Sequence, residues 1–472
     1  MDVMHLYFLL PSLPVDELLL LLLYVGCALA ASVHALLTKP DPAATFVWIL
    51  LCWLLPLLGA ALYGLLGINR VRSRARMLRP RRSATHAGHP ATPGIAAQIT
   101  SIGDAVTQWP LIPGNHVEAL ENGENAFPPM LAAIAAAQHS VWLATYIFET
   151  DAVGQRFIQA LAAARARGVE VRVLVDGVGE WYSWPHAVPQ LRRAGVTAAR
   201  FLPPRLFPPT LALNLRNHRK LLLVDGHTGF LGGMNIGGRE VGKGSDRRMA
   251  DLHFCVRGPV VAQLAQAFDV DWNFAAGESL DLPPPAESAG DCTCRVITEG
   301  PDEDNDKLLF VILGAIGVAR RRVLIMTPYF IPPPALTAAL QTAALRGVEV
   351  ILVLPERSNL RYVDWATQRW LPPLLERGVQ VYLQPPPFSH TKLVVVDEGY
   401  AQIGSANLDP RSLRLNFEIA LEVYDETTCG WLTRYVLGAR SHSRALTLAD
   451  VRRQTLPARV RDSLLWLLSP YL

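Results

Sequence analysis

The chain has 472 residues and a formal net charge of +3, and half of its residues are hydrophobic. One compact core rarely extends to this length, so two or three structural units are expected. The seven arginines between Arg70 and Arg82 carry more positive charge than the net charge of the whole chain. The remainder of the chain is therefore close to neutral or slightly acidic and gives no nucleic-acid-binding signal. The six cysteines lack CxxC spacing, which argues against a zinc site and a disulfide framework.

The first 69 residues contain two apolar runs, Leu18–Leu37 and Thr45–Leu66. Each is near the ~20 residues that a helix needs to cross a bilayer, and the prolines between them favour a tight turn. We therefore expect a transmembrane helical hairpin. A cleaved signal peptide is the alternative for the first run, but the first 16 residues contain no Lys or Arg and a second apolar run follows at once.

The seven arginines follow the second apolar run directly, whereas the loop between the runs contains only Lys39. By the positive-inside rule this asymmetry places the domain that follows in the cytoplasm. The same cluster would attract anionic lipid headgroups. Small polar residues and prolines then predict a linker up to residue 112.

An internal repeat organises the rest of the chain. Val141–Phe148 is followed by Arg167–Asp176, and the similar Val323–Phe330 is followed by Arg346–Pro355. Each pair predicts two apolar strands joined by an Ala/Leu-rich helix, and this connection makes the strands parallel. The predicted fold is α/β, with a hairpin at 1–69, a basic segment and linker at 70–112, and two similar domains of mixed sheet and flanking helices at 113–285 and 286–472.

Each half contains the motif HxKxxxxD, followed at the same distance by a Gly-rich element that ends in Asn. The motif residues are His218, Lys220 and Asp225 in the first half, and His390, Lys392 and Asp397 in the second; the asparagines are Asn235 and Asn407. One HxK pair is common and carries little information, but two complete copies at one spacing indicate function. Since side chains two residues apart on a strand project together, each half offers one imidazole and one ammonium group on one face.

These groups suit the cleavage of a phosphodiester. One histidine can attack phosphorus while the other protonates the leaving alkoxide. The lysines and asparagines can stabilise the negative charge that develops in the transition state, and this chemistry needs neither a metal nor a cofactor.

Carboxylates are expected to orient the two imidazoles. Asp251 follows His218 by 33 residues and Glu418 follows His390 by 28, each at the start of a further apolar strand, and we assign both this role. Asp225 and Asp397 belong to the motif and are counted with its catalytic set. At a strand end, however, such a carboxylate more often caps turn amides.

At these residues the chain resembles the phospholipase D superfamily, and within it the bacterial cardiolipin synthases. The resemblance rests on both HxKxxxxD motifs, on Gly233–Asn235 and Ser405–Asn407, and on the similarity of Gly404–Glu418, Asn217–Lys220 and the closing Ser469–Leu472 to that family. It implies two phospholipase D-like domains, a supporting role for Ser405, and a multi-pass enzyme of the bacterial inner membrane with its catalytic domain on the cytoplasmic side.

The resemblance also implies the reaction. His218 would attack a phosphatidylglycerol phosphorus to give a phosphohistidine, and His390 would protonate the departing glycerol. His390 would then activate the hydroxyl of a second phosphatidylglycerol, which yields cardiolipin. Phosphatidylglycerol and other anionic phospholipids are the expected partners, with no cofactor, no metal and no nucleic acid. Hydrolysis of the phosphohistidine, transfer to another alcohol, a nuclease and a binding-only protein are the alternatives.

Three further segments are open to two interpretations each. The Pro-rich stretch at 201–213 either dips into the membrane interface or packs on the domain. Trp181, Tyr182 and Trp184 lie at headgroup level or, as we favour, pack in a turn or core. The C-terminal tail, with Arg452, Arg453, Arg459 and Arg461 before an apolar segment, either rests on anionic membrane or docks on the protein body.

Overall fold

The computed structural model of the chain describes residues 14–39, 42–67, 95–107, 109–204, 215–241, 248–301, 306–467 and 469. It divides into two compact units, Met1–Arg74 and Ala75–Leu472, which are taken in turn below. The arginine cluster at 70–82 and most of the Pro-rich stretch, residues 205–214, lie outside the described residues.

The N-terminal unit is built on two packed helices, α1 (Val15–Thr38) and α2 (Pro42–Leu54). Trp53 Nε1 donates to Ser32 Oγ at 3.1 Å, and the Tyr24 hydroxyl donates to the Trp53 carbonyl. Within the described residues, α1 alone is long and apolar enough to cross a bilayer. The predicted first span is thus present as one helix of 24 residues.

The prediction of a second unbroken span over Thr45–Leu66 is wrong. Helix α2 has 13 residues, about 20 Å, against the ~30 Å of a bilayer core. Proline 56 has no N–H to continue the helix, and Leu57 takes a positive φ of 60°. The chain then turns back as α3 (Leu58–Leu62) and a π-helical turn η3 (Tyr63–Gly67). A Cβ on Gly59 would lie 2.2 Å from the Leu51 carbonyl oxygen, so this return requires glycine.

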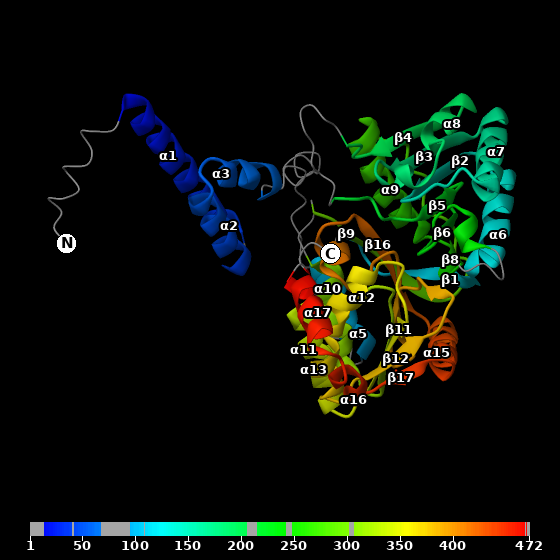
Figure 1. The fold of residues 1–472 in the computed structure, drawn as a ribbon. Helices are drawn as coiled ribbons and strands as arrows, with labels where there is room; N and C mark the ends of the chain where they lie inside the picture. Colours follow the sequence, from blue (N-terminus) through cyan, green and yellow to red (C-terminus); the bar gives the residue numbers. More distant parts are fainter. Residues whose placement is uncertain are drawn as a thin grey trace. The chain divides into compact units, whose positions relative to one another are not determined.

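The second unit consists of two halves with matching order of elements (Figure 1). The first contains β1 (Ile112–Glu121), α6 (Asn122–Ala136), β2 (Ser140–Thr145), α7 (Ala152–Ala166), β3 (Glu170–Asp176), η4 (Gly179–Tyr182), α8 (Ala187–Arg193), β4 (Thr197–Phe201), β5 (Leu221–Val224), β6 (Thr228–Gly232), η6 (Gly238–Glu240), β7 (Met249–Ala250), β8 (Leu252–Arg257) and α9 (Val261–Ala276). The second contains β9 (Cys292–Glu299), α10 (Lys307–Val318), β10 (Arg322–Met326), α11 (Pro334–Leu345), β11 (Glu349–Pro355), α12 (Arg361–Gln368), α13 (Leu371–Leu375), β12 (Gln380–Gln384), β13 (Phe388–Ser389), β14 (Leu393–Val396), β15 (Tyr400–Gly404), α14 (Pro410–Arg414), β16 (Glu418–Tyr424), α15 (Glu426–Ser441), β17 (Arg444–Leu446), α16 (Leu448–Arg452) and α17 (Leu456–Leu467).

Fifteen strands of the described residues form one sheet that runs through both halves, in the order β17-β12-β11-β10-β14-β15-β16-β9-β1-β8-β6-β5-β2-β3-β4. The order is symmetric about the β9-β1 pair: β16, β15, β14, β10, β11 and β12 on one side answer β8, β6, β5, β2, β3 and β4 on the other. The internal repeat therefore extends to the topology. The predicted boundary near residue 285 falls between α9 and β9, where no strand crosses.

Within each half the strands predicted to be parallel are parallel. Val141 of β2 pairs with Val171 of β3, and Val323 of β10 pairs with Val350 of β11. The motif strands β5 and β14 run antiparallel to β2 and β10, which makes the sheet mixed, as predicted.

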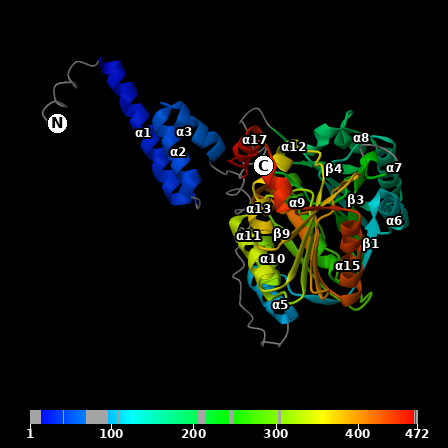
Figure 2. The same cartoon turned by 60° about the horizontal axis from the view of Figure 1, so that its bottom comes forward.

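Helices cover both faces of the sheet, with α10 and α11 on one side of the second half and α15 on the other (Figure 2). Alternation along a strand supplies both layers. In β2, Val141 and Leu143 join the core under α6 and α7, whereas the buried Trp142 stacks on Phe268 of α9 at 5.5 Å. Because both faces are buried, the central strands are apolar throughout rather than alternating.

Part of the expected linker before residue 112 is a helix in the described residues. Helix α5 (Ile95–Val106) packs against α10 of the second half. Ile99 is fully buried there, and Asp104 forms an ion pair with the buried Arg295. The segment that precedes the first half is therefore fixed to the second.

Candidate active site

The two motif segments occupy equivalent places, immediately before β5 and β14. Leu221 of β5 pairs with Ala144 of β2, and Leu393 of β14 pairs with Met326 of β10. The residues before Leu221 and Leu393 therefore continue past the carboxyl ends of the parallel strands, which is where α/β sheets place their sites.

The halves are hydrogen bonded to each other through these segments. The His218 N–H donates to the Phe417 carbonyl at 2.9 Å, and the His390 N–H donates to the Ala250 carbonyl at 2.7 Å. Phe388 and Ser389 of β13 also pair in parallel with Met249 and Ala250 of β7. Each histidine segment thus lies beside the segment that leads to the acidic residue of the other half.

Because each histidine segment pairs with a segment of the other half, each histidine contacts the carboxylate of the other half. His218 Nδ1 lies 3.1 Å from the Glu418 carboxylate, and His390 Nδ1 lies 3.0 Å from Asp251 Oδ2. All four side chains are buried or nearly so. A carboxylate on Nδ1 fixes the tautomer that carries its proton there, which leaves Nε2 as the reactive nitrogen. Neither half contains a complete histidine–carboxylate pair of its own.

Burial controls the pKa values of both imidazoles. It lowers the pKa of His218, against the opposing effect of Glu418. It lowers the pKa of His390 to about 4, with a second contribution from the Lys392 ammonium. Burial would raise the pKa of Glu418, but His218, Lys220 and a hydrogen bond from Ser405 outweigh it and leave that pKa below its usual value. A bound phosphodiester would add negative charge and raise the pKa of both histidines.

Each motif lysine contacts the backbone of the histidine two residues before it. Lys220 Nζ donates to the His218 carbonyl at 2.7 Å, and Lys392 Nζ donates to the His390 carbonyl. Burial lowers the pKa of Lys220 to about 7 and lowers that of Lys392. An anion in the site would favour the charged form of each ammonium.

The asparagines and Ser405 lie in the same region. Asn235 Oδ1 accepts from the Ile147 N–H at 3.0 Å, and Asn407 Nδ2 donates to Ser412 Oγ at 3.2 Å. Ser405 Oγ donates to Glu418. The equivalent position in the first half is Gly233, where a Cβ would lie 2.2 Å from Asp251 Oδ2. Ser405 thus supports the Glu418 carboxylate. In the other half, the Asp251 carboxylate occupies the space that a side chain at position 233 would fill.

Asp225 and Asp397 are not brought to the site. Asp225 accepts from the backbone N–H groups of 138–140 at 2.7 to 2.9 Å, and Asp397 accepts from those of 320–322 at 2.7 to 2.8 Å. Both follow the motif strands, so they lie at the other end of β5 and β14 from the histidines. Each caps the turn that leads into β2 or β10, the role that a carboxylate at a strand end favours.

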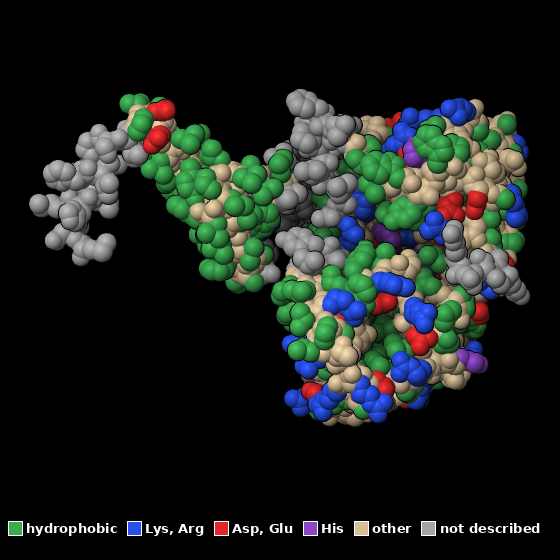
Figure 3. Space-filling model, in the orientation of Figure 1, with side chains coloured by type: hydrophobic (Ala, Val, Ile, Leu, Met, Phe, Trp, Pro, Cys, Tyr) green, Lys and Arg blue, Asp and Glu red, His purple; other side chains and the backbone are tan. Residues whose placement is uncertain are grey.

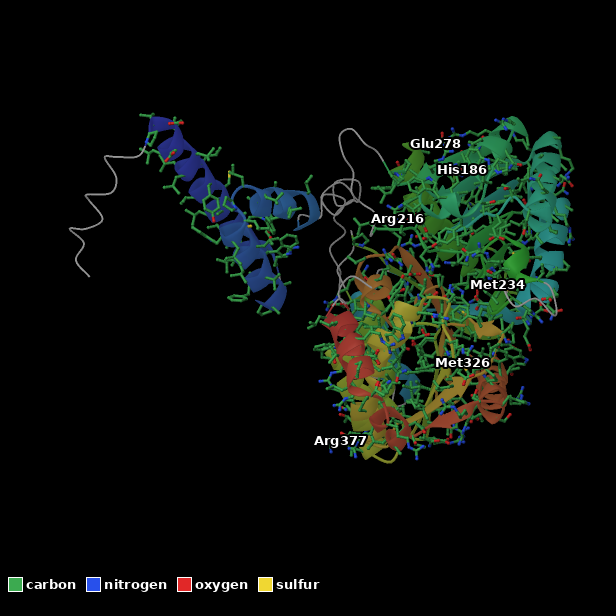
Figure 4. The ribbon with its side chains drawn as sticks, viewed as in Figure 1. His186, Arg216, Met234, Glu278, Met326 and Arg377 are labelled. Atoms are coloured by element: carbon green, nitrogen blue, oxygen red, sulfur yellow. The ribbon has the colours of Figure 1, made fainter. Side chains whose placement is uncertain are left out.

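A cavity brings the two motifs together between the halves. It encloses about 1010 Å³, including the part that opens to solvent. The side chains around it include His218, Asn235, His390 and Asn407 from the predicted set, and Tyr146, Tyr182, Arg216, Arg239, Tyr329, Asn359, Tyr362, Asp409, Arg411, Ser412 and Asn416 in addition. Figure 3 shows a hollow with histidine and basic side chains between the halves, and Figure 4 labels Arg216 at this boundary.

Several residues of the site were missed from the sequence. Glu240 accepts from the Asn235 N–H at 3.2 Å, and burial, together with the nearby Asp251, raises its pKa to about 8. Asn416 Nδ2 donates to Glu418 at 3.1 Å. Glu240 and Ser412 each follow the motif asparagine of their half by five residues. Extending the repeat comparison by five residues would have aligned Glu240 with Ser412.

Aromatic rings also contact both histidines. The Tyr146 ring lies edge-on to His218 with centroids 5.2 Å apart, and the Tyr329 ring lies edge-on to His390 at 6.2 Å. Each tyrosine follows the end of a parallel strand, β2 or β10. They limit the approach of water to the imidazoles from that side.

A duplicated α/β fold with one His–Lys–Asn set per half, closed around a shared cavity, defines a two-domain enzyme of the phospholipase D type. Residues 130–272 and 312–437 match the family model for the phospholipase D-like domain of cardiolipin synthase, and 27–67 match a phospholipase D-nuclease N-terminal model. The chain belongs to the cardiolipin synthase family of the phospholipase D superfamily.

Relatives agree with this assignment, and a solved structure agrees with the fold. The chain is 31% identical to the major cardiolipin synthase ClsA of Bacillus subtilis (strain 168), over 97% of this chain and all of the relative. It is 39% identical to cardiolipin synthase A of Pseudomonas aeruginosa (strain LESB58), over 69% of this chain and 67% of the relative. The crystal structure of phosphatidylserine synthase from Haemophilus influenzae Rd KW20 superposes with a TM-score of 0.63 at 14% identity, covering 79% of this chain and all of that one. This last likeness concerns the fold.

Proposed function

We propose that the protein is a cardiolipin synthase that joins two phosphatidylglycerol molecules and releases glycerol. One observation carries the proposal: His218 and His390, from different halves, line one cavity, and each has a carboxylate on Nδ1. Two imidazoles with free Nε2 atoms at one phosphodiester are what a double displacement needs. The identity of the substrate is inferred from the relatives, which are named cardiolipin synthases.

In the first step, Nε2 of His218 attacks the phosphorus of one phosphatidylglycerol. The bond from phosphorus to the headgroup glycerol breaks, and His390 donates a proton to the departing alkoxide. The product is a phosphatidyl group on His218 and free glycerol. Assigning attack to His218 follows the family resemblance, and the lowered pKa of Glu418 supports it, because an ionised partner stabilises the cationic phosphohistidine.

In the second step, His390 is neutral and accepts the proton of a headgroup hydroxyl of a second phosphatidylglycerol. That oxygen attacks phosphorus, the bond to His218 breaks, and cardiolipin is formed. The same residue thus acts first as acid and then as base. Exclusion of water between the steps decides in favour of transfer rather than hydrolysis.

The lysines and asparagines that recur in both halves stabilise charge. Lys220 and Lys392 provide ammonium groups under the two histidines, and Asn235 and Asn407 provide amide groups at the cavity wall. Negative charge on the equatorial phosphoryl oxygens is their target. Helix α1 anchors the enzyme in the inner membrane, and the arginines at 70–82 hold the catalytic unit on the cytoplasmic side.

The direct test is to reconstitute the full chain in vesicles that contain labelled phosphatidylglycerol and to identify the products. Cardiolipin and free glycerol in equal amounts are expected. Phosphatidic acid as the sole product would refute transfer, and cardiolipin formed only when phosphatidylethanolamine is present would refute phosphatidylglycerol as the donor.

Histidine variants test whether the site is shared. His218→Ala and His390→Ala should each reduce turnover by at least about 10³-fold, since each removes one of two essential proton or phosphoryl carriers. The matched control is His227→Ala, because His227 is exposed and does not line the cavity. Near-normal turnover in either cavity variant would mean that one half works alone.

A further inference from the structure

The outer face of the last described helix carries an apolar stripe. In α17, Leu456, Val460, Leu464 and Leu467 are 71%, 50%, 59% and 63% exposed. Spacings of four, four and three residues place them on one side of the helix. Scattered exposed leucines need no explanation, but a continuous row along one helix indicates a contact surface.

The opposite face of α17 holds the helix to the protein. Leu465 packs against the cluster of Ile331, Val363 and Ala366. The Trp466 ring lies 6.2 Å from that of Trp370, and Arg461 lies over the ring of Trp365 at 4.3 Å. The docking of the tail on the protein body, one of its two expected interpretations, is therefore present. This docking leaves the outward stripe largely exposed.

The stripe lies beside the mouth of the cavity. Helix α17 packs on α12, and Tyr362 and Val363 of α12 line the cavity. Both helices face the viewer in Figure 1, and Figure 3 shows hydrophobic side chains over α17 and again across the hollow, on the first half.

The opposite rim of the cavity presents aromatic residues. Tyr182 lines the cavity from the short helix η4, and its neighbours Trp181 and Trp184 are 60% and 83% exposed. Trp181 and Trp184 are therefore not buried in a core, whereas the Tyr182 ring contacts that of Tyr146 with centroids 6.2 Å apart. Tryptophan and tyrosine favour the level of lipid headgroups, where an apolar ring and a polar group are both satisfied.

Basic side chains surround the stripe. Arg361 and Arg369 flank α12, and Arg452, Arg453, Arg459 and Arg461 belong to α16, α17 and the turn between them; all six are exposed. Arg452 forms an ion pair with Glu376 at 3.0 Å, and Arg461 with Asp462 at 2.7 Å. A helix with an apolar face and flanking arginines matches a bilayer surface rich in anionic lipid.

We propose that α17 and η4 form a membrane-docking surface on the two rims of the cavity, with an anionic phospholipid bilayer as its partner. The stripe enters the boundary between headgroups and acyl chains, the arginines contact phosphates, and the tryptophans hold the opposite rim. The cavity mouth is then presented to lipid headgroups without extraction of a whole lipid into water. This inference rests on the proposed function for its purpose, but its structural basis is independent of the reaction.

A depth-sensitive label tests the contact without any activity. The full chain with Leu464→Cys is labelled with an environment-sensitive fluorophore and reconstituted in vesicles of phosphatidylcholine and phosphatidylglycerol that contain acyl-chain quencher lipids. The matched control is Leu345→Cys. Leu345 is an exposed leucine at the end of α11, close to the start of β11, whereas the cavity lies at the other end of the parallel strands. Labelled protein without either substitution gives the background of the native cysteines.

The proposal predicts that lipid quenchers reduce emission from position 464 and that quenching increases with the phosphatidylglycerol fraction, while position 345 stays solvent-like. A solvent-like label at 464 would overturn it. So would a shielded label that lipid quenchers do not reach, which would mean cover by the N-terminal helices, or shielding that varies with protein concentration, which would mean a second copy of the chain.

Kinetics give a second readout. The double variant Leu456→Glu and Leu464→Glu should raise by about tenfold the mole fraction of phosphatidylglycerol needed for half-maximal rate, with the maximal rate unchanged. Turnover of a monomeric short-chain phosphatidylglycerol should not change, and Leu345→Glu should behave as wild type. An equal loss on both substrates would contradict docking. If wild type itself does not turn over, the proposed function fails, while the label still decides the contact.

Discussion

The two histidine–carboxylate pairs occupy equivalent places in the repeat but have different surroundings. Glu418, which contacts His218, also accepts from Ser405 and Asn416. Asp251, which contacts His390, accepts from the Leu252 N–H at 2.8 Å and has as a neighbour the buried carboxyl of Glu240, whose pKa is raised to about 8. Glu418 is thus held by two neutral donors, whereas Asp251 lies beside a second acidic residue, Glu240.

The difference indicates that duplication preserved the reacting groups and allowed their supports to diverge. A nucleophile needs a partner that is ionised throughout the cycle, because the phosphohistidine is cationic. The surroundings of Glu418, which hold its pKa below the usual value, fit the support of a nucleophile.

Removing the charge of each carboxylate should give the largest effects. Glu418→Gln and Asp251→Asn are both expected to lower kcat by about 10²- to 10⁴-fold, because the tautomer of each histidine is no longer fixed. Glu418→Gln should be the more severe, since the amide also loses its pairing with Ser405 and Asn416. Rates measured in vesicles give the ratio. A larger loss in Asp251→Asn would reverse the roles that we assign.

Gly233→Ala should come next. The added Cβ meets Asp251 Oδ2 at 2.2 Å, so the carboxylate must move and His390 loses its orientation. We expect a loss of kcat of about 10²-fold with little change in KM. The matched control is Gly168→Ala, a turn glycine with open space around its Cβ position. It should lose stability through its positive φ but keep kcat in the folded fraction.

Ser405→Ala should have a smaller effect. It removes one of two neutral donors to Glu418 and leaves His218 in contact with that carboxylate, so we expect a loss of about tenfold. The loss should increase as pH falls, because the pKa of Glu418 rises when the hydrogen bond is removed. A pH profile identical in shape to that of wild type would contradict this role.

Acid should destabilise the protein through His390. Its pKa is about 4 in the folded state against 6.5 for the free side chain, so the unfolded state binds the proton first and stability falls as pH drops below 6.5. His390→Gln removes this contribution. Relative to wild type, the variant should gain roughly 1 to 3 kcal/mol between pH 7.5 and pH 5. Thermal unfolding in detergent at both values measures it, and an unchanged difference would contradict burial as the cause.

The smallest effect on chemistry is expected at the capping acids. Asp225→Asn and Asp397→Asn each weaken hydrogen bonds to three backbone N–H groups at the far end of the motif strands, so about 1 to 2 kcal/mol of stability should be lost. kcat of the folded enzyme should remain within about twofold of wild type. A loss of kcat at unchanged thermal stability would return these residues to the catalytic set.

Local pattern predicted much of the fold. The apolar β-branched segments, the Ala/Leu-rich helices and the Arg-Gly stops predicted the parallel strands. The spacing of the two motifs predicted four of the side chains that line the cavity, those of His218, Asn235, His390 and Asn407. The helix α5 was missed because its docking on α10 depends on residues 200 positions away. The broken second apolar helix was missed because hydropathy does not register the turn at Pro56.

The pairing of each histidine with the carboxylate of the other half is the main feature that could not be predicted from the sequence. Asp251 is nearer to His218 in the chain, yet it contacts His390, 139 residues away. Spacing along one half cannot reveal that β7 pairs with β13, because that contact exists only when both halves are folded. Exposure of Trp181 and Trp184 likewise depends on the finished surface rather than on the local segment.

The most direct test of a shared site with divided roles is to trap the covalent intermediate. A phosphatidyl ester with a p-nitrophenol leaving group needs no acid, so His390→Ala should still form the intermediate and then retain it for lack of a base. Peptide mass spectrometry should place the phosphatidyl group on His218, with none in His218→Ala. A phosphatidyl group on His390 in His218→Ala, with His218 unmodified in His390→Ala, would contradict the account.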